Sequence, residues 1–106
     1  YTNVASKETL KTVREGMWSA VNGSRATIKT LAGMQVKVAA KTGTAEFGAL
    51  NKDGVYENTH AWTTSFFPFE NPKYAVTIFL EDGGESINAV RTTKEMIEWI
   101  IRNDLI

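Results

Sequence analysis

Two β-prone runs joined by a short turn constrain the fold of this chain most strongly. Residues 61–69 are rich in aromatic and β-branched side chains, and residues 73–81 alternate between two largely apolar faces. Glu70-Asn71-Pro72 separates them, and so short a connection joins antiparallel neighbours. Because both faces of residues 73–81 are apolar, we expect a central strand covered by helices on both sides. Pro68 should lie near a strand end, and the large aromatic residues of the first run should be buried: Trp62, Phe66 and Phe67.

Two helices are expected to flank these strands. One spans Ser6–Asn22, with Ser6 as its N-cap and Gly23 just past its end. The other spans Ser86–Asn103, with Ser86 at its N-cap. Apolar residues recur at helical spacing in both segments and predict core-facing stripes: Leu10, Val13, Met17 and Val21 in the first, and Ile87, Val90, Ile97 and Ile101 in the second.

A third strand is expected over Val36–Phe47, and it contains Lys41-Thr42-Gly43-Thr44-Ala45-Glu46. Side chains alternate along a strand, so Thr42 and Thr44 share one face, about 7 Å apart at a rise of ~3.4 Å per residue. Gly43 lets a ligand backbone lie close, and Lys41 is long enough to reach around the strand. This strand would suit an extended peptide that ends in a carboxylate.

At the start of this third strand, apolar and polar residues are expected on the same face of the sheet. Strict alternation puts Val36 and Val38 on the face of the two threonines. Either the strand emerges from the core, or a bulge near Ala39-Ala40 changes its register.

The segment 48–59 is polar, and its Asp53-Gly54 is a turn signal. We expect an exposed loop between two antiparallel strands, in which Tyr56 and Asn58 could touch a substrate, although an ordinary loop explains them as well. His60 is tempting as a catalytic base, but a single histidine at a strand start is more often structural.

Composition excludes several function classes. The chain has 106 residues, enough for one small domain, with 12 basic and 12 acidic side chains and zero net charge. This balance argues against nucleic-acid binding and against a polybasic membrane role. With no cysteine and one histidine, a metal cluster is not expected. We also predict no cofactor. No apolar run approaches the ~20 residues of a membrane span.

The motif Lys41–Glu46, with His60-Ala61-Trp62 and Pro68 downstream, resembles the end of a penicillin-binding protein transpeptidase domain. K-T-G is the third motif of that superfamily, after S-x-x-K and S-x-N. The likeness is greatest to the class B, monofunctional enzymes of the penicillin-binding protein 2 type. It implies an α+β fold, in which the three strands expected here belong to a five-stranded antiparallel sheet flanked by N- and C-terminal helices.

The resemblance also implies an activity and residue roles. The family cross-links peptidoglycan through a serine acyl-enzyme, and β-lactams acylate the same serine. Thr42 and Thr44 would bind the ligand carboxylate, and Gly43 would allow its close approach. The Thr44 N–H would be one of two oxyanion-hole donors, and Lys41 would reach the S-x-N serine. Ala40 stands where the family often has a glycine, which bears on the fine geometry.

Two of the three family motifs are missing from the sequence. No lysine has a serine three residues before it, so S-x-x-K and its nucleophile are absent. Ser86-Ile87-Asn88 matches S-x-N as a string, but it follows K-T-G instead of preceding it, and Ser86 fits a helix N-cap better than a nucleophile. We therefore expect residues 1–106 to be the C-terminal portion of a single transpeptidase domain, inactive alone.

The expected partners and location follow from the same resemblance. They are a stem peptide or β-lactam, the N-terminal remainder of the domain, and the extracytoplasmic face of a bacterial cytoplasmic membrane, reached through an anchor outside this chain. An exposed sheet edge also predicts that the chain either self-associates or needs its complementary half. Two alternatives stay open: a β-lactamase or β-lactam sensor of the same fold, and a non-enzymatic α+β interaction module in which K-T-G is accidental.

Overall fold

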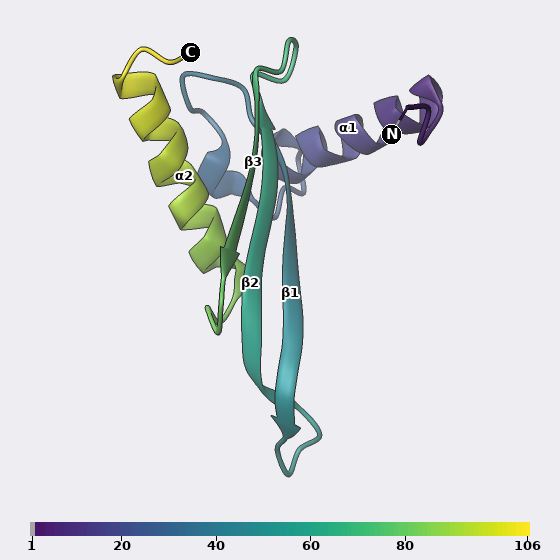
Figure 1. The fold of residues 1–106 in the computed structure, drawn as a ribbon, viewed down its shortest axis with the longest axis vertical. Coiled ribbons are helices and arrows are strands. Elements are labelled where there is room, and N and C mark those ends of the chain that lie inside the picture. Colours follow the sequence, from purple (N-terminus) through teal and green to yellow (C-terminus); the bar gives the residue numbers. More distant parts are fainter. Residues whose placement is uncertain (1) are drawn as a thin grey trace.

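The chain folds into a three-stranded antiparallel sheet with one long helix before it and one after it (Figure 1). The computed structural model describes residues 2–106. Its elements are α1 (Lys7–Asn22), the short 3-10 helix η1 (Lys29–Leu31), β1 (Ala39–Leu50), β2 (Tyr56–Phe67), β3 (Tyr74–Leu80) and α2 (Ser86–Arg102). The predicted α+β architecture is confirmed. No helix within residues 2–106 combines the length and the hydropathy needed to cross a membrane.

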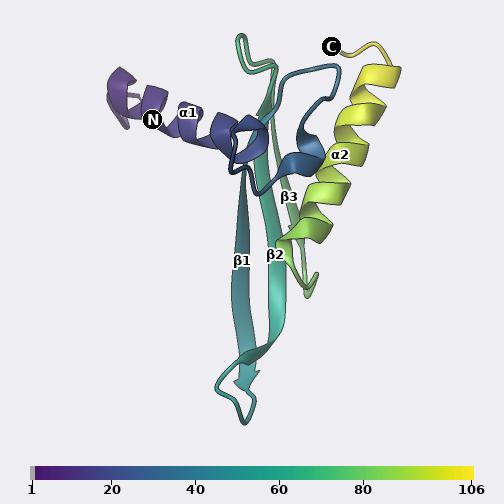
Figure 2. The same cartoon turned by 180° about the vertical axis from the view of Figure 1, so that it is seen from behind.

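The sheet has the order β1-β2-β3, and its register is regular along most of its length. The strand β1 begins at Ala39, not at Val36, and no bulge lies at Ala39-Ala40. The irregularity falls between Phe47 and Leu50 instead. The β1–β2 hairpin therefore extends well beyond the helices (Figure 2), and the segment expected to be a loop shrinks to residues 51–55.

The helix α2 covers one face of the sheet, along β2 and β3. On β2 every second side chain is buried against this layer, from Ala61 through Thr63 and Ser65 to Phe67. Complete burial of a side chain as large as Phe67 contributes about 1.5–3 kcal/mol. The predicted stripe on α2 is confirmed at its centre by buried Val90 and Ile97.

The start of α2 differs from the prediction. Glu85 is the N-cap, and Ser86 is the first helical residue. No side-chain hydrogen bond caps this end. The Asn88 side-chain amide donates to the Gly83 carbonyl at 2.7 Å, and Gly84 takes a φ of 74°.

The helix α1 meets the sheet only near the start of β1 and then projects away from it (Figures 1 and 2). Its predicted N-cap is confirmed, since the Ser6 hydroxyl accepts from the Thr9 N–H at 3.1 Å. Its predicted core stripe is wrong over the first two turns. Val21 is buried, whereas Leu10 is 49% and Val13 53% exposed, because no element of residues 2–106 lies over that part of the helix.

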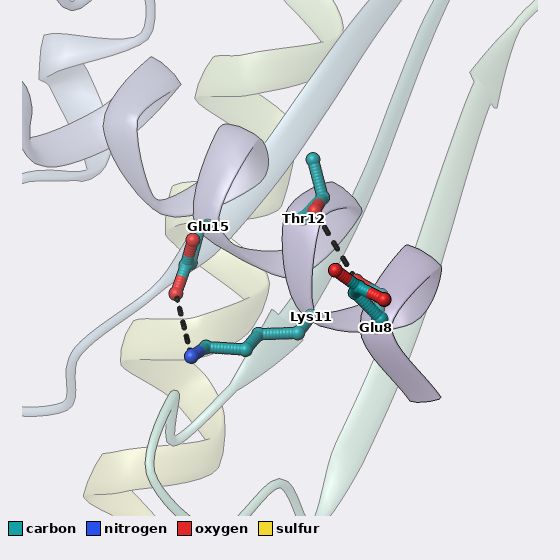
Figure 3. Close-up of polar contacts among 4 residues, drawn as sticks. All are labelled: Glu8, Lys11, Thr12 and Glu15. Carbon is teal, nitrogen blue, oxygen red and sulfur yellow. Dashed lines mark hydrogen bonds and ion pairs between the residues drawn. The ribbon is translucent and has the colours of Figure 1, made fainter. Parts of the chain in front are cut away.

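The solvent-facing side of α1 carries polar contacts along the helix (Figure 3). The Lys11 ammonium lies 3.9 Å from a Glu15 carboxylate oxygen, and the Thr12 hydroxyl donates to the main-chain carbonyl of Glu8 at 3.2 Å. An exposed i,i+4 ion pair stabilises a helix by about 0.2–0.5 kcal/mol, whereas a threonine hydroxyl bonded to the carbonyl four residues earlier does not. The ion pair supports the part of α1 that lies away from the sheet.

The sheet face opposite α2 is largely uncovered, which corrects two predictions. We expected β3 to be covered on both sides, but Phe79 is 45% exposed; we also expected Trp62 to be buried, but it is 39% exposed. Both are wrong for one reason, namely that α1 stays at the end of the sheet. Phe67, on the α2 side, is fully buried as predicted, while Phe66 is half-buried.

The packing of the β3–α2 turn against the sheet can be tested at Gly83, where the main chain lies close to Leu80 and Ala61. An added Cβ would lie 2.5 Å from the Leu80 Cβ and 3.2 Å from the Ala61 Cβ. We expect Gly83→Ala to lower the free energy of unfolding by about 1–3 kcal/mol, because the β3–α2 turn must shift. Gly16→Ala is the control, since nothing lies within 4 Å of its Cβ on α1; it should stabilise by about 0.5–1 kcal/mol. Urea unfolding followed by tryptophan fluorescence measures both, and equal effects would contradict the packing described.

Candidate active site

The Lys41–Thr44 motif lies on β1, whose outer edge is unpaired within residues 2–106. Lys41 pairs with Thr64, Thr42 with Thr63, Gly43 with Trp62 and Thr44 with Ala61 across the β1–β2 ladder. The motif therefore presents one paired side, toward β2, and one free side. An unpaired edge of this kind offers its free N–H and C=O groups to another extended chain.

Thr42 and Thr44 share the face that α2 covers, while Lys41 and Gly43 share the opposite face with Trp62. Burial falls steadily along the first face, from fully buried Ala40 through partly buried Thr42 to exposed Thr44. The strand thus emerges from the core, which settles the conflict in the sequence between an apolar start and a polar end. The predicted sharing of one face by the two hydroxyls is confirmed.

The direction of the main-chain groups follows from one hydrogen bond. The Lys41 ammonium donates to the Thr42 carbonyl at 2.6 Å, so this carbonyl points to the free edge instead of into the ladder. In an antiparallel edge strand the N–H and C=O of one residue point the same way, and the direction alternates along the chain. The N–H of Thr44 therefore also points to the free edge, beside the positively charged Lys41.

A hollow of about 440 Å³ lies beside this edge, between α1 and the motif. Lys41 and Thr42 form part of its wall, and the remainder is mostly apolar. Its other lining residues are Val13, Gly16, Met17, Ala20, Thr27 and Ile28. The exposed stripe of α1 thus faces the same space as the motif, and a ligand on the edge would lie against both.

Gly43 has an ordinary environment on the face away from the threonines. A Cβ there would lie 3.4 Å from the Trp62 Cβ, at the limit of normal contact. Trp62 in turn packs on Phe79, with ring centroids 4.4 Å apart. A side chain at Gly43 would therefore meet Trp62 first, and not the outer edge where a ligand backbone would lie.

His60 has a structural environment, as predicted. Its Nδ1 accepts from the Asp82 N–H at 2.9 Å, and its ring stacks on Phe47 at 4.1 Å. Asn58 lies in β2, not in a loop, and its amide donates to the Asp82 carboxylate at 3.1 Å. Tyr56 pairs with Leu50 near the hairpin tip. None of these three residues pairs with the Lys41–Thr44 segment.

Thr63 is a site neighbour that the sequence did not single out. It pairs with Thr42 and is completely buried. Its hydroxyl has no hydrogen-bond partner within the part of the chain that the structure describes. The sequence carried little signal for it, because Thr63 is one of three consecutive polar residues in a run of which only the aromatic residues were assigned to the core. Across residues 2–106, no three His, Asp or Glu side chains gather as a metal ion would require.

Comparison with known proteins identifies the class to which this fold and edge belong. The family model described as penicillin binding protein transpeptidase domain matches residues 2–98. The chain therefore belongs to the penicillin-binding protein transpeptidase family.

Two relatives are named as peptidoglycan D,D-transpeptidases. MrdA of Haemophilus influenzae is 32% identical over 102 residues, covering 87% of this chain and 16% of MrdA. PbpA of Mycolicibacterium smegmatis is 44% identical over 54 residues, covering 51% of this chain and 10% of PbpA. The chain thus spans about a sixth or less of the length of these two proteins.

Solved structures share the fold. A complex between penicillin-binding protein (PBP2) and MreC from Helicobacter pylori matches with a TM-score of 0.79 and 30% identity, over 94% of this chain and 18% of that one. An imipenem acyl-enzyme complex of penicillin-binding protein A from M. tuberculosis matches with a TM-score of 0.68 and 30% identity, over 89% of this chain and 19% of that one. Both identify this chain as a transpeptidase-like α+β unit of the class B type.

The alternation of main-chain groups on β1 is directly measurable. We expect the amide protons of Thr42 and Thr44 to exchange quickly with solvent, because they point to the free edge, and those of Lys41 and Gly43 to be protected by the ladder. Hydrogen–deuterium exchange followed by NMR resolves the four amides. Thr64 and Ser65 on the central strand β2 are the controls, since both of their amides should be protected. Protection of Thr44 together with rapid exchange at Gly43 would overturn the assigned direction.

Proposed function

We propose that this chain forms the K-T-G wall of the active site of a peptidoglycan D,D-transpeptidase, whose nucleophilic serine lies outside these 106 residues. One observation carries the proposal: Lys41, Thr42 and Thr44 meet on a free strand edge beside a hollow, in a chain of the penicillin-binding protein transpeptidase family. The relatives' activity supports this reaction. The substrates would be stem peptides, and β-lactams would act as their mimics.

Thr42 and Thr44 would bind the carboxylate of the substrate or β-lactam. Their hydroxyls are on one face and become progressively more open to solvent along β1. Hydroxyl donors to a carboxylate form charge-assisted hydrogen bonds, which are stronger than neutral ones. Lys41 adds a positive charge on the same edge and would reach the serine of the absent S-x-N motif. Before that serine is in place, the hydrogen bond from Lys41 to the Thr42 carbonyl keeps the ammonium beside the edge.

The Thr44 N–H would be one of the two oxyanion-hole donors. It points to the free edge, so it is available to the negative charge that develops on the attacked carbonyl oxygen. The second donor would come from the absent nucleophile segment. Gly43, between the two threonines, would be the point where the ligand backbone lies close against the strand, as the family resemblance implies.

The remainder of the transpeptidase domain would complete the fold. Residues 2–106 leave the outer edges of β1 and β3 unpaired and the Trp62 face open. Exposed apolar surface next to a sheet edge is typical of a surface made to be covered. We propose that residues 1–106 are the C-terminal portion of one transpeptidase domain, which acts at the bacterial cell envelope, on the extracytoplasmic face of the cytoplasmic membrane.

The oxyanion-hole assignment predicts the effect of removing a single N–H. Thr44→Pro deletes this donor, which points away from the ladder where edge strands tolerate proline, together with the Thr44 hydroxyl, whereas Thr44→Val deletes the hydroxyl alone. In the full-length protein we expect the rate of acylation by benzylpenicillin to be about 10²–10³-fold lower for Thr44→Pro than for Thr44→Val. Glu46→Pro is the matched control, because Glu46 lies two residues further along the same edge and its N–H also points outward. It should acylate at a rate close to that of the wild type.

Intact-mass spectrometry after incubation with benzylpenicillin measures these rates and also tests the whole proposal. The full-length protein should gain one drug adduct, and the 106-residue chain should gain none. An adduct on a serine of the isolated chain would contradict the assignment of the nucleophile to another segment. An unlabelled full-length protein would contradict the transpeptidase function.

The incomplete fold predicts self-association of the isolated chain. Trp62 and Phe79 form an exposed aromatic surface between two free edges. We expect analytical ultracentrifugation to show dimers or larger species for the 106-residue chain, and a Trp62→Ser/Phe79→Ser variant to shift the population toward monomer. A wild-type chain that is monomeric and unfolds cooperatively would argue against a missing portion of the domain.

A further inference from the structure

We propose that Thr63 is a positioning residue, which donates a hydrogen bond to the Thr42 hydroxyl when a carboxylate ligand is bound. The inference deepens the proposed function and rests on its assignment of Thr42 to the carboxylate. Thr63 itself is completely buried on the central strand, so a bound ligand would not touch it. It would act only through Thr42.

The unpaired hydroxyl of Thr63 is the first observation. Three polar side chains are buried in the described part of the chain: Thr63, Ser65 and Thr93. The Thr93 hydroxyl donates to the Ala89 carbonyl at 2.8 Å, and that of Ser65 donates to the Val76 carbonyl at 3.4 Å. Of these three buried hydroxyls, only that of Thr63 lacks a hydrogen-bond partner among residues 2–106. A buried, unpaired hydroxyl costs stability that a valine of the same shape would avoid. The presence of a hydroxyl at this position is therefore explained if it gains a hydrogen-bond partner when a ligand is bound.

The register supplies that partner. Thr63 and Thr42 are directly opposite each other and project from the same face of the sheet. Because the Thr42 carbonyl points to the free edge, they form a non-hydrogen-bonded pair of the ladder, in which side chains approach most closely. Cross-strand threonines can hydrogen-bond to one another. The same sheet contains an example, since the hydroxyl oxygens of the paired residues Thr64 and Thr77 lie 3.1 Å apart.

The chemistry of a hydroxyl group gives the arrangement a direction. Thr42 has one O–H, which it would donate to the carboxylate, so its oxygen remains free to accept a hydrogen bond. The Thr63 O–H can fill that acceptor site, and a hydroxyl that accepts a hydrogen bond becomes a stronger donor. The bond would also hold Thr42 in the rotamer that faces the ligand. Thr44 has no such support, because its cross-strand partner is Ala61.

The test uses the full-length protein and a β-lactam in two forms, one with a free carboxylate and one with that carboxylate methylated. Thr63→Val keeps the shape and removes the hydroxyl, whereas Thr63→Ser keeps the hydroxyl. We expect Thr63→Val to slow acylation by the free acid about fivefold to tenfold, to leave the ester's rate unchanged and not to lower the melting temperature. Thr63→Ser should retain the rate for the acid, even if it lowers the melting temperature.

Two further variants separate positioning from structure. In a Thr42→Val background, Thr63→Val should have no additional effect on the acid, because the residue through which it acts is gone. Thr93→Val removes a buried hydroxyl on α2 that already has a partner. It should lower the melting temperature without changing the ratio of the acylation rates by the acid and by the ester.

Each other outcome counts against the inference. Equal slowing of acid and ester, loss of rate in proportion to loss of stability in both Thr63 variants, or an unchanged rate in Thr63→Val would overturn it. If the wild type is not acylated at all, the proposed function fails and the inference fails with it. A labelled wild type with an unchanged Thr63→Val rate overturns the inference alone.

Discussion

The antiparallel pairing of β1 with β2 is the constraint on which the rest of this structure depends. Side chains alternate with a period of two, so the register that places Thr42 opposite Thr63 decides which face every other residue of both strands occupies. A slip of one residue would turn Thr42 and Thr44 toward Trp62 and put Lys41 against α2. The site is therefore a consequence of register more than of any local feature of the motif.

The packing of α2 fixes that register energetically. Ala61, Thr63, Ser65 and Phe67 are buried beneath this helix, while their neighbours on β2 are not. A slipped register would turn the side chain of Phe67 out of this core and turn Trp62, Thr64 and Phe66 toward α2. The cluster around Phe67 also includes Val21 of α1 and Val38 just before β1, so the same core joins both helices to the start of the motif strand. As β1 leaves this core, its side chains pass from full burial to exposure within five residues, and the motif lies at that transition.

The two faces of the sheet have different roles in this unit. The α2 face is closed along the buried residues of β2, which determine stability, and opens only toward Thr44 on β1. The opposite face carries a chain of ring contacts from Phe47 through His60 and Phe79 to Trp62, which is organised but remains open to solvent. Together with the free edges of β1 and β3 and the exposed first turns of α1, this face explains why a unit with a well-packed core still displays so much apolar surface.

The sequence by itself determined the element types, their order, the antiparallel pairing and the identity of the Lys41–Thr44 motif, because periodicity and turn residues are local signals. It also predicted that Thr42 and Thr44 share a face, which follows from the strand period alone. Only the tertiary structure decided that Trp62 and Leu10 are exposed, because burial depends on which distant element covers a face, and an apolar pattern does not say whether a partner is present. It likewise decided that the Thr44 N–H points to the free edge and that Thr63 lies unpaired behind Thr42. Each of these depends on contacts between residues far apart in the chain, and no local pattern encodes them.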